Sequence, residues 1–319
     1  QTAQLIADTA APLTGQSGSN CGGNYTDGPN HDWGHGTIDA YAAVQAALTY
    51  GSAGDIIRVT PTGATSGACG ADWSTPCNLL YALGSVATLG DELWVAAGVY
   101  KPTTSTTDQT AYIELKSEVD VYGGFAGTET LRSQRDPAAN VTIFSGDIDG
   151  NDSQSPIVTD AYTVIGTTTN SYHVAAGTPT GATLDGVTIT GGYGYYGCTY
   201  GWNSQFGGGL YTQGAMTLNN VTFSGNQNFR GGGLYTTARL TVTNSTFTGN
   251  YASGTGGGIH NGAHDSDAIL MINVTFTNNR AYYDGGGAYG GGTLILNNVT
   301  FTDNWAGTNA GGLYAAGAA

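Results

Sequence analysis

Short runs of alternating hydrophobic and polar residues fill the second half of the chain, and the alternation changes phase inside each run. In LTVTNSTF, Leu240 and Val242 share one parity, whereas Ser245 and Phe247 share the other. Side chains of a β-strand alternate with a period of two, so a strand changes phase only where it bends. The pattern therefore predicts two short strands joined by a corner at Asn244. The same change of phase occurs at Asn220, Asn273 and Asn298.

Asparagine suits these four corners because it tolerates the left-handed backbone conformation. Asparagine side chains that stack on one another also hydrogen-bond along a ladder. We therefore expect these four corner residues to form a structural ladder. A Gly triplet precedes each pair of strands and predicts a further corner, where φ is positive.

The strand pairs belong to a sequence repeat. Phe223, Phe247, Phe276 and Phe301 follow one another at intervals of 24, 29 and 25 residues, and an Asn follows each Phe three positions later. Repeats of this length are typical of solenoids, and strands this short stack as a parallel β-helix whose core holds columns of Phe, Leu, Val and Ile. We predict an all-β parallel β-helix over residues 53–319, with the clearest repeats in 183–319. Weaker copies lie at 183–192, 140–147 and 113–125.

The first fifty residues have a different pattern. QLIADTAAPL predicts one helix and GTIDAYAAVQAALTYG predicts another, with Ile38, Tyr41, Val44 and Leu48 on one face of the second. We therefore expect a short α-helical segment over residues 1–52, ahead of the solenoid.

Composition and charge exclude several kinds of partner. The chain has 319 residues, a formal net charge of −15 and only eight Lys plus Arg, which argues against nucleic acid and anionic membrane surfaces. No apolar run approaches the roughly 20 residues that a membrane helix needs, so we expect no membrane insertion.

Cys69 and Cys77 bracket a short loop and predict a disulfide, and Cys21 and Cys198 are able to pair only through the fold. Together these features favour an extracellular or cell-surface protein.

Two resemblances extend this interpretation. The pairing of GGG[LI] with FxxN is similar to the repeats of the polymorphic outer-membrane protein family, and DELWVAAGVYKPT and VYGGFAGTETLRSQRD resemble the first coils of secreted bacterial right-handed β-helix proteins. The resemblance implies a right-handed, single-stranded β-helix at a bacterial surface.

The segment PNHDWGHGTIDAYAAVQAAL resembles the C-terminal end of a subtilisin-like serine peptidase domain. In that family the catalytic triad lies upstream of this point, and the nucleophile motif GTSxA occurs nowhere in the sequence. His31, Asp32 and His35 therefore correspond to the turn before the closing helix. We interpret them as polar loop residues and expect no catalytic residue in this chain.

Two sets of residues are candidates for binding. Aromatic residues in the loops that follow the FxxN corners fall on one edge of the solenoid and suit contact with sugars or proteins. The alternative is that these loops pack on themselves. The residues include Tyr195, Tyr196, Trp202, Tyr282, Tyr283 and Trp305. The segment SGDIDGND places side-chain oxygens at a spacing that suits calcium, at Asp147, Asp149, Asn151 and Asp152. The alternative is an acidic turn, because the EF-hand pattern is incomplete. No cofactor is required, and calcium is the one candidate.

Two functions are compatible with these features. The preferred one is a non-catalytic surface rod with a structural, adhesive or filament-forming role, whose partners are copies of itself or cell-surface polysaccharide. The coil that begins at Gly311 is cut off at Ala319. We expect either a head-to-tail contact there or further chain.

The alternative function is the non-catalytic C-terminal part of a secreted subtilisin-like peptidase, with the β-helix as a targeting or carbohydrate-binding module. A polysaccharide-cleaving enzyme is disfavoured, because the repeats hold Arg230, Arg239 and Arg280 as their only cations.

Overall fold

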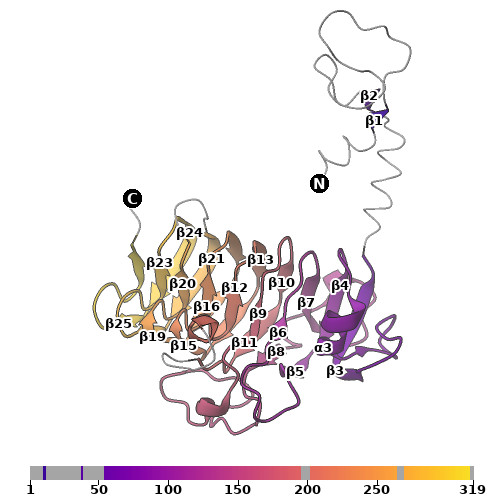
Figure 1. The fold of residues 1–319 in the computed structure, drawn as a ribbon, viewed down its shortest axis with the longest axis horizontal. Helices are drawn as coiled ribbons and strands as arrows, with labels where there is room; N and C mark the ends of the chain where they lie inside the picture. The colour runs from indigo at the N-terminus through magenta and orange to yellow at the C-terminus, as the bar shows by residue number, and fades with distance from the viewer. Residues whose placement is uncertain (1–9, 12–36, 39–53, 195–201, 264–268, 317–319) are drawn as a thin grey trace, which may run out of the picture. The chain divides into compact units, whose positions relative to one another are not determined.

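The computed structural model describes residues 10–11, 37–38, 54–194, 202–263 and 269–316, and the chain divides into two units, Gln1–Gly54 and Asp55–Ala319 (Figure 1). In the first unit, β1 (Ala10–Ala11) pairs antiparallel with β2 (Thr37–Ile38). The two predicted helices therefore do not include these four residues, since pairing with a distant segment holds them extended. The other residues of both helices lie outside the described part, as do His31, Asp32 and His35.

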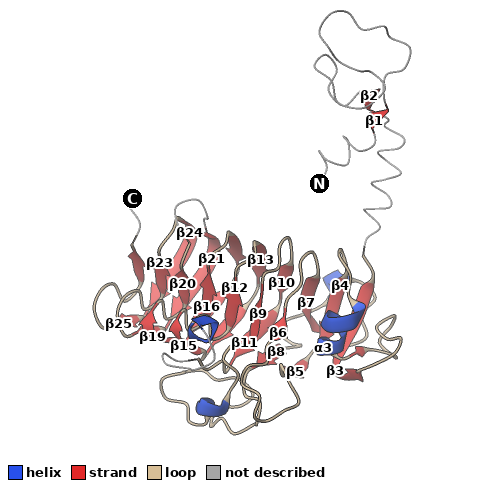
Figure 2. Ribbon diagram, in the orientation of Figure 1, coloured by secondary structure: helices blue, strands red, loops and turns tan. Residues whose placement is uncertain are grey.

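Residues 55–316 form a parallel β-helix, so the predicted fold is confirmed. Parallel strands stack coil upon coil from β3 to β26, and the few helices are short (Figures 1 and 2). The largest sheet has 13 strands. In chain order they are β3 (Ile56–Ala64), β4 (Glu92–Ala96), β5 (Gly98–Tyr100), β7 (Asp120–Phe125), β8 (Thr142–Ser145), β10 (Thr183–Asp185), β11 (Val187–Thr190), β13 (Met216–Asn219), β14 (Thr222–Ser224), β17 (Leu240–Thr243), β18 (Thr246–Thr248), β21 (Ile269–Thr277) and β24 (Leu294–Thr302).

Two smaller sheets run along the later coils. The seven-stranded sheet contains β6 (Ile113–Glu114), β9 (Ala175–Gly177), β12 (Leu210–Thr212), β16 (Leu234–Thr236), β20 (Ile259–Asn261), β23 (Ala288–Gly290) and β26 (Leu313–Ala315). The four-stranded sheet contains β15 (Gln227–Arg230), β19 (Tyr251–Thr255), β22 (Arg280–Ala281) and β25 (Trp305–Ala306). The helical turns are α3 (Leu79–Tyr81), η1 (Ala82–Val86), η2 (Arg132–Gln134), η3 (Thr167–Thr169) and η4 (Trp202–Gln205).

The corner asparagines have the conformation that the phase change requires. Asn220, Asn244, Asn273 and Asn298 have φ of 50°, 51°, 55° and 53°. The amide of Asn298 donates to Asn273 at 2.8 Å and that of Asn273 donates to Asn244 at 3.1 Å, which makes an exposed ladder between coils. The predicted fourth member, Asn220, is not part of it: its amide donates to Asp185 at 3.2 Å, and that of Asn244 donates to Asn219. In β21 and β24 the strand continues through the corner. The repeat unit thus contains three or four strands rather than the two predicted, because the short strands of the smaller sheets carry no clear alternation.

A second asparagine ladder lies inside the coils and was not assigned from the sequence. Asn226, Asn250 and Asn279 are fully buried, and each amide Nδ2 donates to the Oδ1 of the next Asn at 2.9–3.1 Å, ending at Asn304. The Oδ1 atoms of Asn250, Asn279 and Asn304 also accept the backbone N–H of the Asn one coil earlier, and Asn226 Oδ1 accepts that of Gly192. These side chains therefore satisfy backbone groups at the corner between the largest and the four-stranded sheets.

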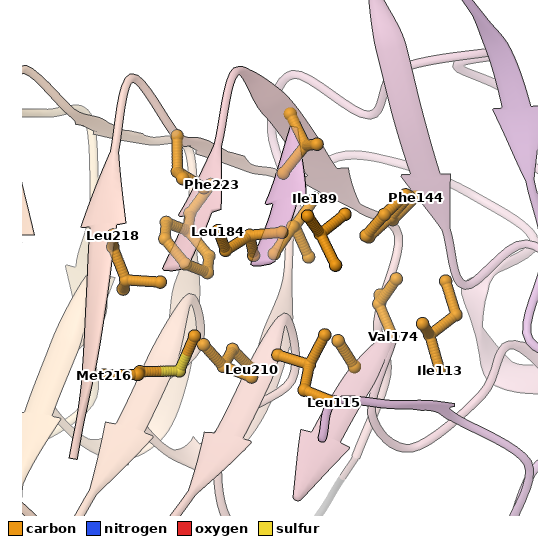
Figure 3. Close-up of a cluster of buried hydrophobic side chains, with 14 of the residues drawn as sticks. Ile113, Leu115, Phe144, Val174, Leu184, Ile189, Leu210, Met216, Leu218 and Phe223 are labelled. Atoms are coloured by element: carbon orange, nitrogen blue, oxygen red, sulfur yellow. The ribbon is translucent and has the colours of Figure 1, made fainter. Parts of the chain in front are cut away.

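The core is made of columns of side chains that stack at matching positions (Figure 3). Phe223, Phe247 and Phe276 are fully buried and their rings stack at centroid distances of 4.6 and 4.9 Å. Phe301 ends this column and is only partly buried. Strand register continues the column in the other direction through Ile189 to Phe144.

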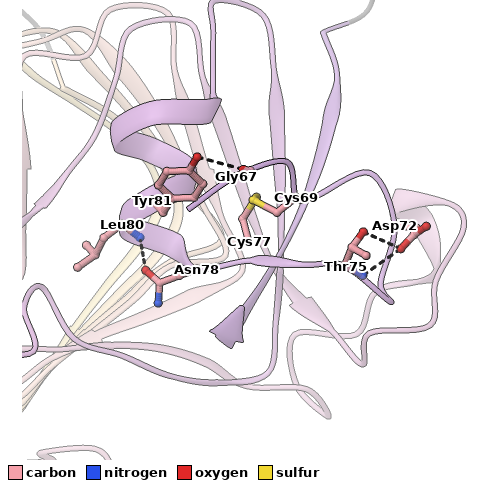
Figure 4. The surroundings of a disulfide bond; sticks show 8 residues. All are labelled: Gly67, Cys69, Asp72, Thr75, Cys77, Asn78, Leu80 and Tyr81. Atoms are coloured by element: carbon pink, nitrogen blue, oxygen red, sulfur yellow. Dashed lines mark hydrogen bonds between the residues drawn. A yellow bond between two sulfur atoms is a disulfide. The ribbon is translucent and has the colours of Figure 1, made fainter. Parts of the chain in front are cut away.

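The predicted disulfide between Cys69 and Cys77 is confirmed (Figure 4). Cys77 is fully buried against the first coil, and Asn78 caps the turn that follows by accepting the N–H of Leu80 at 3.0 Å. The bond thus holds an exposed loop onto the first coils. Cys21 and Cys198 lie outside the described residues, so their pairing stays a prediction.

Candidate functional site

The outer face of the four-stranded sheet carries a cluster of aromatic side chains, which we call the aromatic patch. Strand register places Tyr251 beside Arg280 and Arg280 beside Trp305 on successive coils. Three further residues flank this row, of which Tyr162 comes from the loop after β8 and Tyr282 and Tyr283 follow β22. The patch therefore consists of Tyr162, Tyr251, Arg280, Tyr282, Tyr283 and Trp305.

Four of the six side chains are about half exposed. The exposed fractions are 60% for Tyr162, 56% for Tyr282, 52% for Trp305 and 48% for Tyr283. Large aromatic side chains are more often buried than exposed, so a group of them at the surface is a candidate contact site.

Ring contacts join the four tyrosines of the patch in two pairs. Tyr162 lies edge-on to Tyr251 with centroids 5.5 Å apart, and the Arg280 guanidinium lies 4.9 Å from the centre of the Tyr162 ring. Tyr282 and Tyr283 are perpendicular at 4.9 Å. Burial raises the pKa of Tyr251, and its neighbours Tyr162 and Tyr282 add to that rise. Planar aromatic faces beside an arginine suit stacking against an uncharged ring.

The patch agrees only in part with the sequence prediction. It brings together Tyr282, Tyr283 and Trp305, whereas Tyr195 and Tyr196 lie outside the described residues. Trp202 begins η4, but its side chain is not described. Tyr162 was missed because it lies in a loop that follows no repeat.

A second aromatic row lies on the outer face of the seven-stranded sheet. Its rings face one another along the row at centroid distances of 4.5–5.8 Å; they are Tyr211, Tyr235, His260, Tyr289 and Tyr314. Because these rings cover one another's faces, the row is suited to support of the sheet rather than to stacking with a ligand. A shallow depression of about 370 Å³ adjoins Tyr211 and is also lined by His173, Glu114 and Gln213.

His260 gives this row a pH dependence. Its side chain is 5% exposed, and burial, assisted by the charge of Arg230, lowers its pKa to about 3. The unfolded chain binds a proton at the ordinary pKa of about 6.5, so folding loses stability as the pH falls from 6.5 toward 3. We expect the wild-type unfolding free energy to fall by about 1.4 kcal/mol more per pH unit in this window than that of His260→Tyr. Denaturation of both proteins between pH 7 and 4 tests this, and parallel pH profiles would contradict it.

Two of the four predicted calcium ligands, Asp147 and Asn151, make hydrogen bonds that build the acidic loop itself. Asp147 Oδ1 accepts the backbone N–H groups of Gly150 at 2.8 Å and Asn151 at 3.1 Å, which closes the turn. The Asn151 amide bridges Asp149 and Thr169 at 2.8 and 3.0 Å. Among the described residues, no three His, Cys, Asp or Glu side chains form a metal-ligating group. The four predicted ligands are therefore not brought together as one set.

Comparison with known proteins gives a match to one family of repeats. Residues 244–262 and 273–291 each match the Chlamydia polymorphic membrane protein repeat. Both matches run from a corner asparagine of the exposed ladder through the next strand of the seven-stranded sheet. No curated protein and no solved structure matched the chain. Within the described part of the chain, no helix is long and apolar enough to cross a membrane.

Proposed function

We propose that the chain is a non-catalytic, adhesive rod on a bacterial surface and that it binds neutral polysaccharide through the aromatic patch. The two polymorphic membrane protein repeats support the surface location. The observation that carries the binding role is the group of half-exposed rings at Tyr162, Tyr282, Tyr283 and Trp305.

The chemistry of the patch favours sugars without charge. Pyranose rings present flat C–H faces that stack on aromatic side chains, while an arginine donates hydrogen bonds to hydroxyl groups. Arg280 is the one cation in the patch, and the net charge of −15 repels anionic polymers. Coils that repeat at about 4.8 Å also offer successive rings to a long chain molecule.

Two other roles stay predictions. A head-to-tail contact between copies would cover the last described coil, where Leu294, Val299, Phe301 and Leu313 are only partly buried. The resemblance to subtilisin-like peptidases rests on residues 29–48, of which the structure describes Thr37 and Ile38. Neither role accounts for the aromatic patch.

A glycan array that displays neutral and acidic polysaccharides tests the proposal. We expect binding to one or more neutral polymers and little binding to uronate-rich or sulfated ones. Arg239→Gln is the control for charge, since Arg239 is exposed and lies outside the patch. Arg280→Gln should weaken binding, whereas Arg239→Gln should leave it unchanged. A preference for acidic polymers, or no glycan binding at all, would contradict the proposal.

A further inference from the structure

Three buried oxygen atoms without a hydrogen-bond partner lie in two adjoining loops, residues 147–152 and 166–170. They are Asp149 Oδ1, Asp152 Oδ1 and Asn170 Oδ1. Among the described residues, six buried side-chain N or O atoms lack a hydrogen-bond partner. These three are the only carboxylate or amide oxygens among the six. A buried acceptor without a partner is costly, so the missing partner is a hydrogen-bond donor or a cation.

The two loops are tied together where these oxygens lie. Asn170 is fully buried, and its Nδ2 donates to Asp152 Oδ2 at 2.9 Å and to the Gly191 carbonyl at 2.7 Å. These two acceptors fix the orientation of the amide, so the unpartnered atom is its oxygen. Asn151 adds a second link through Asp149 and Thr169.

The charge at this place is not balanced by the described protein groups. Asp152 is 7% exposed and Asp147 is 6% exposed, so both carboxylates lie inside the protein. The Lys101 amine contacts the Ile148 carbonyl at 3.5 Å, and among the described residues it forms no ion pair with a carboxylate. Two buried carboxylates therefore share one small region with little compensation.

We propose that a calcium ion binds between the two loops, with Asp149, Asp152 and Asn170 as its protein ligands. Calcium binds carboxylate and amide oxygens and completes its coordination with water. A site made only of oxygen atoms disfavours zinc and copper, which prefer nitrogen and sulfur. The site differs from the one predicted from the sequence, because Asn170 replaces Asp147 and Asn151, which build the loop.

Calorimetric titration of the chelator-treated full chain with calcium chloride tests the site. We expect one-site binding with a dissociation constant of about 10⁻⁴–10⁻³ M, the range of extracellular calcium modules. Asp152→Asn keeps the shape of the side chain and should weaken binding at least tenfold, and Asp149→Asn should do the same from a less buried position. Calcium at about 10 mM should also raise the melting temperature of the wild type by a few degrees but not that of either variant.

Asp303→Asn is the matched control. Asp303 is exposed on a later coil, and Asn278 already occupies the equivalent position one coil earlier with a similar positive φ. This variant loses the same charge and should bind calcium as the wild type does. Absence of calcium binding to the wild type would overturn the proposal and leave water or a proton as the partner of the three oxygens. Undiminished binding by both Asp152→Asn and Asp149→Asn, or equal loss in Asp303→Asn, would overturn it as well.

Discussion

Phe247→Ala should lower the free energy of unfolding by about 4 kcal/mol. Phe247 is fully buried, and its ring is stacked between those of Phe223 and Phe276 at 4.6 and 4.9 Å. Truncation removes the transfer free energy of the ring and leaves a cavity between neighbours that the coils above and below hold in place. Urea or thermal denaturation of the two proteins measures the difference.

Phe301→Ala is the matched control for this prediction. Phe301 belongs to the same column but is only partly buried and stacks on Phe276. We expect its loss to cost about half as much, because less apolar area leaves water on folding. Equal losses for both variants would show that the column is not the continuous core described above.

Asn250→Leu should destabilise the fold by a similar amount, about 4 kcal/mol. The Asn250 side chain accepts the N–H and the amide of Asn226 at 3.0 and 3.1 Å, and donates to the Phe223 carbonyl and Asn279 Oδ1 at 2.9 Å each. Leucine has nearly the same volume but leaves the buried N–H of Asn226 without its acceptor. The cost therefore combines several lost hydrogen bonds with one buried unsatisfied donor.

The exposed ladder supplies the comparison. Asn244→Gly removes hydrogen bonds to Asn219 and Asn273, but glycine keeps the positive φ of 51° without strain. We expect a loss below about 1 kcal/mol, since water replaces those bonds. Comparing the denaturation curves of the two variants separates the ladders, and a smaller loss in Asn250→Leu than in Asn244→Gly would contradict the assignment.

Much of the solenoid is readable from the sequence because its signals are local and repeated. The phase change at Asn244 and the interval from Phe247 to Phe276 arise from the strand period and the coil length. The inward role of Asn250 is not readable in the same way. An Asn three positions after Phe specifies a corner, but nothing in that spacing says whether the side chain faces water or the coil interior.

The candidate sites depend on contacts between segments that no repeat relates. Tyr162 reaches Tyr251 from a loop of irregular sequence, so no period places them together. Asn170 reaches Asp152 across 18 residues that follow no strand pattern. Such contacts are set by how loops fold over the outside of the coils, which hydrophobic periodicity does not record.

The central claim is that the aromatic patch binds neutral polysaccharide. The most direct test is gel electrophoresis in a gel that contains one of the neutral polymers that the wild type binds on the glycan array. The protein to compare with the wild type is the double variant Tyr283→Ala/Trp305→Ala. The control is Tyr112→Ala, which removes an aromatic ring of 43% exposure outside the patch. We expect the polymer to retard the wild type and the control equally, and the double variant to lose about 5- to 160-fold in affinity, as stacked rings contribute about 0.5–1.5 kcal/mol each. Equal retardation of all three proteins would contradict the account.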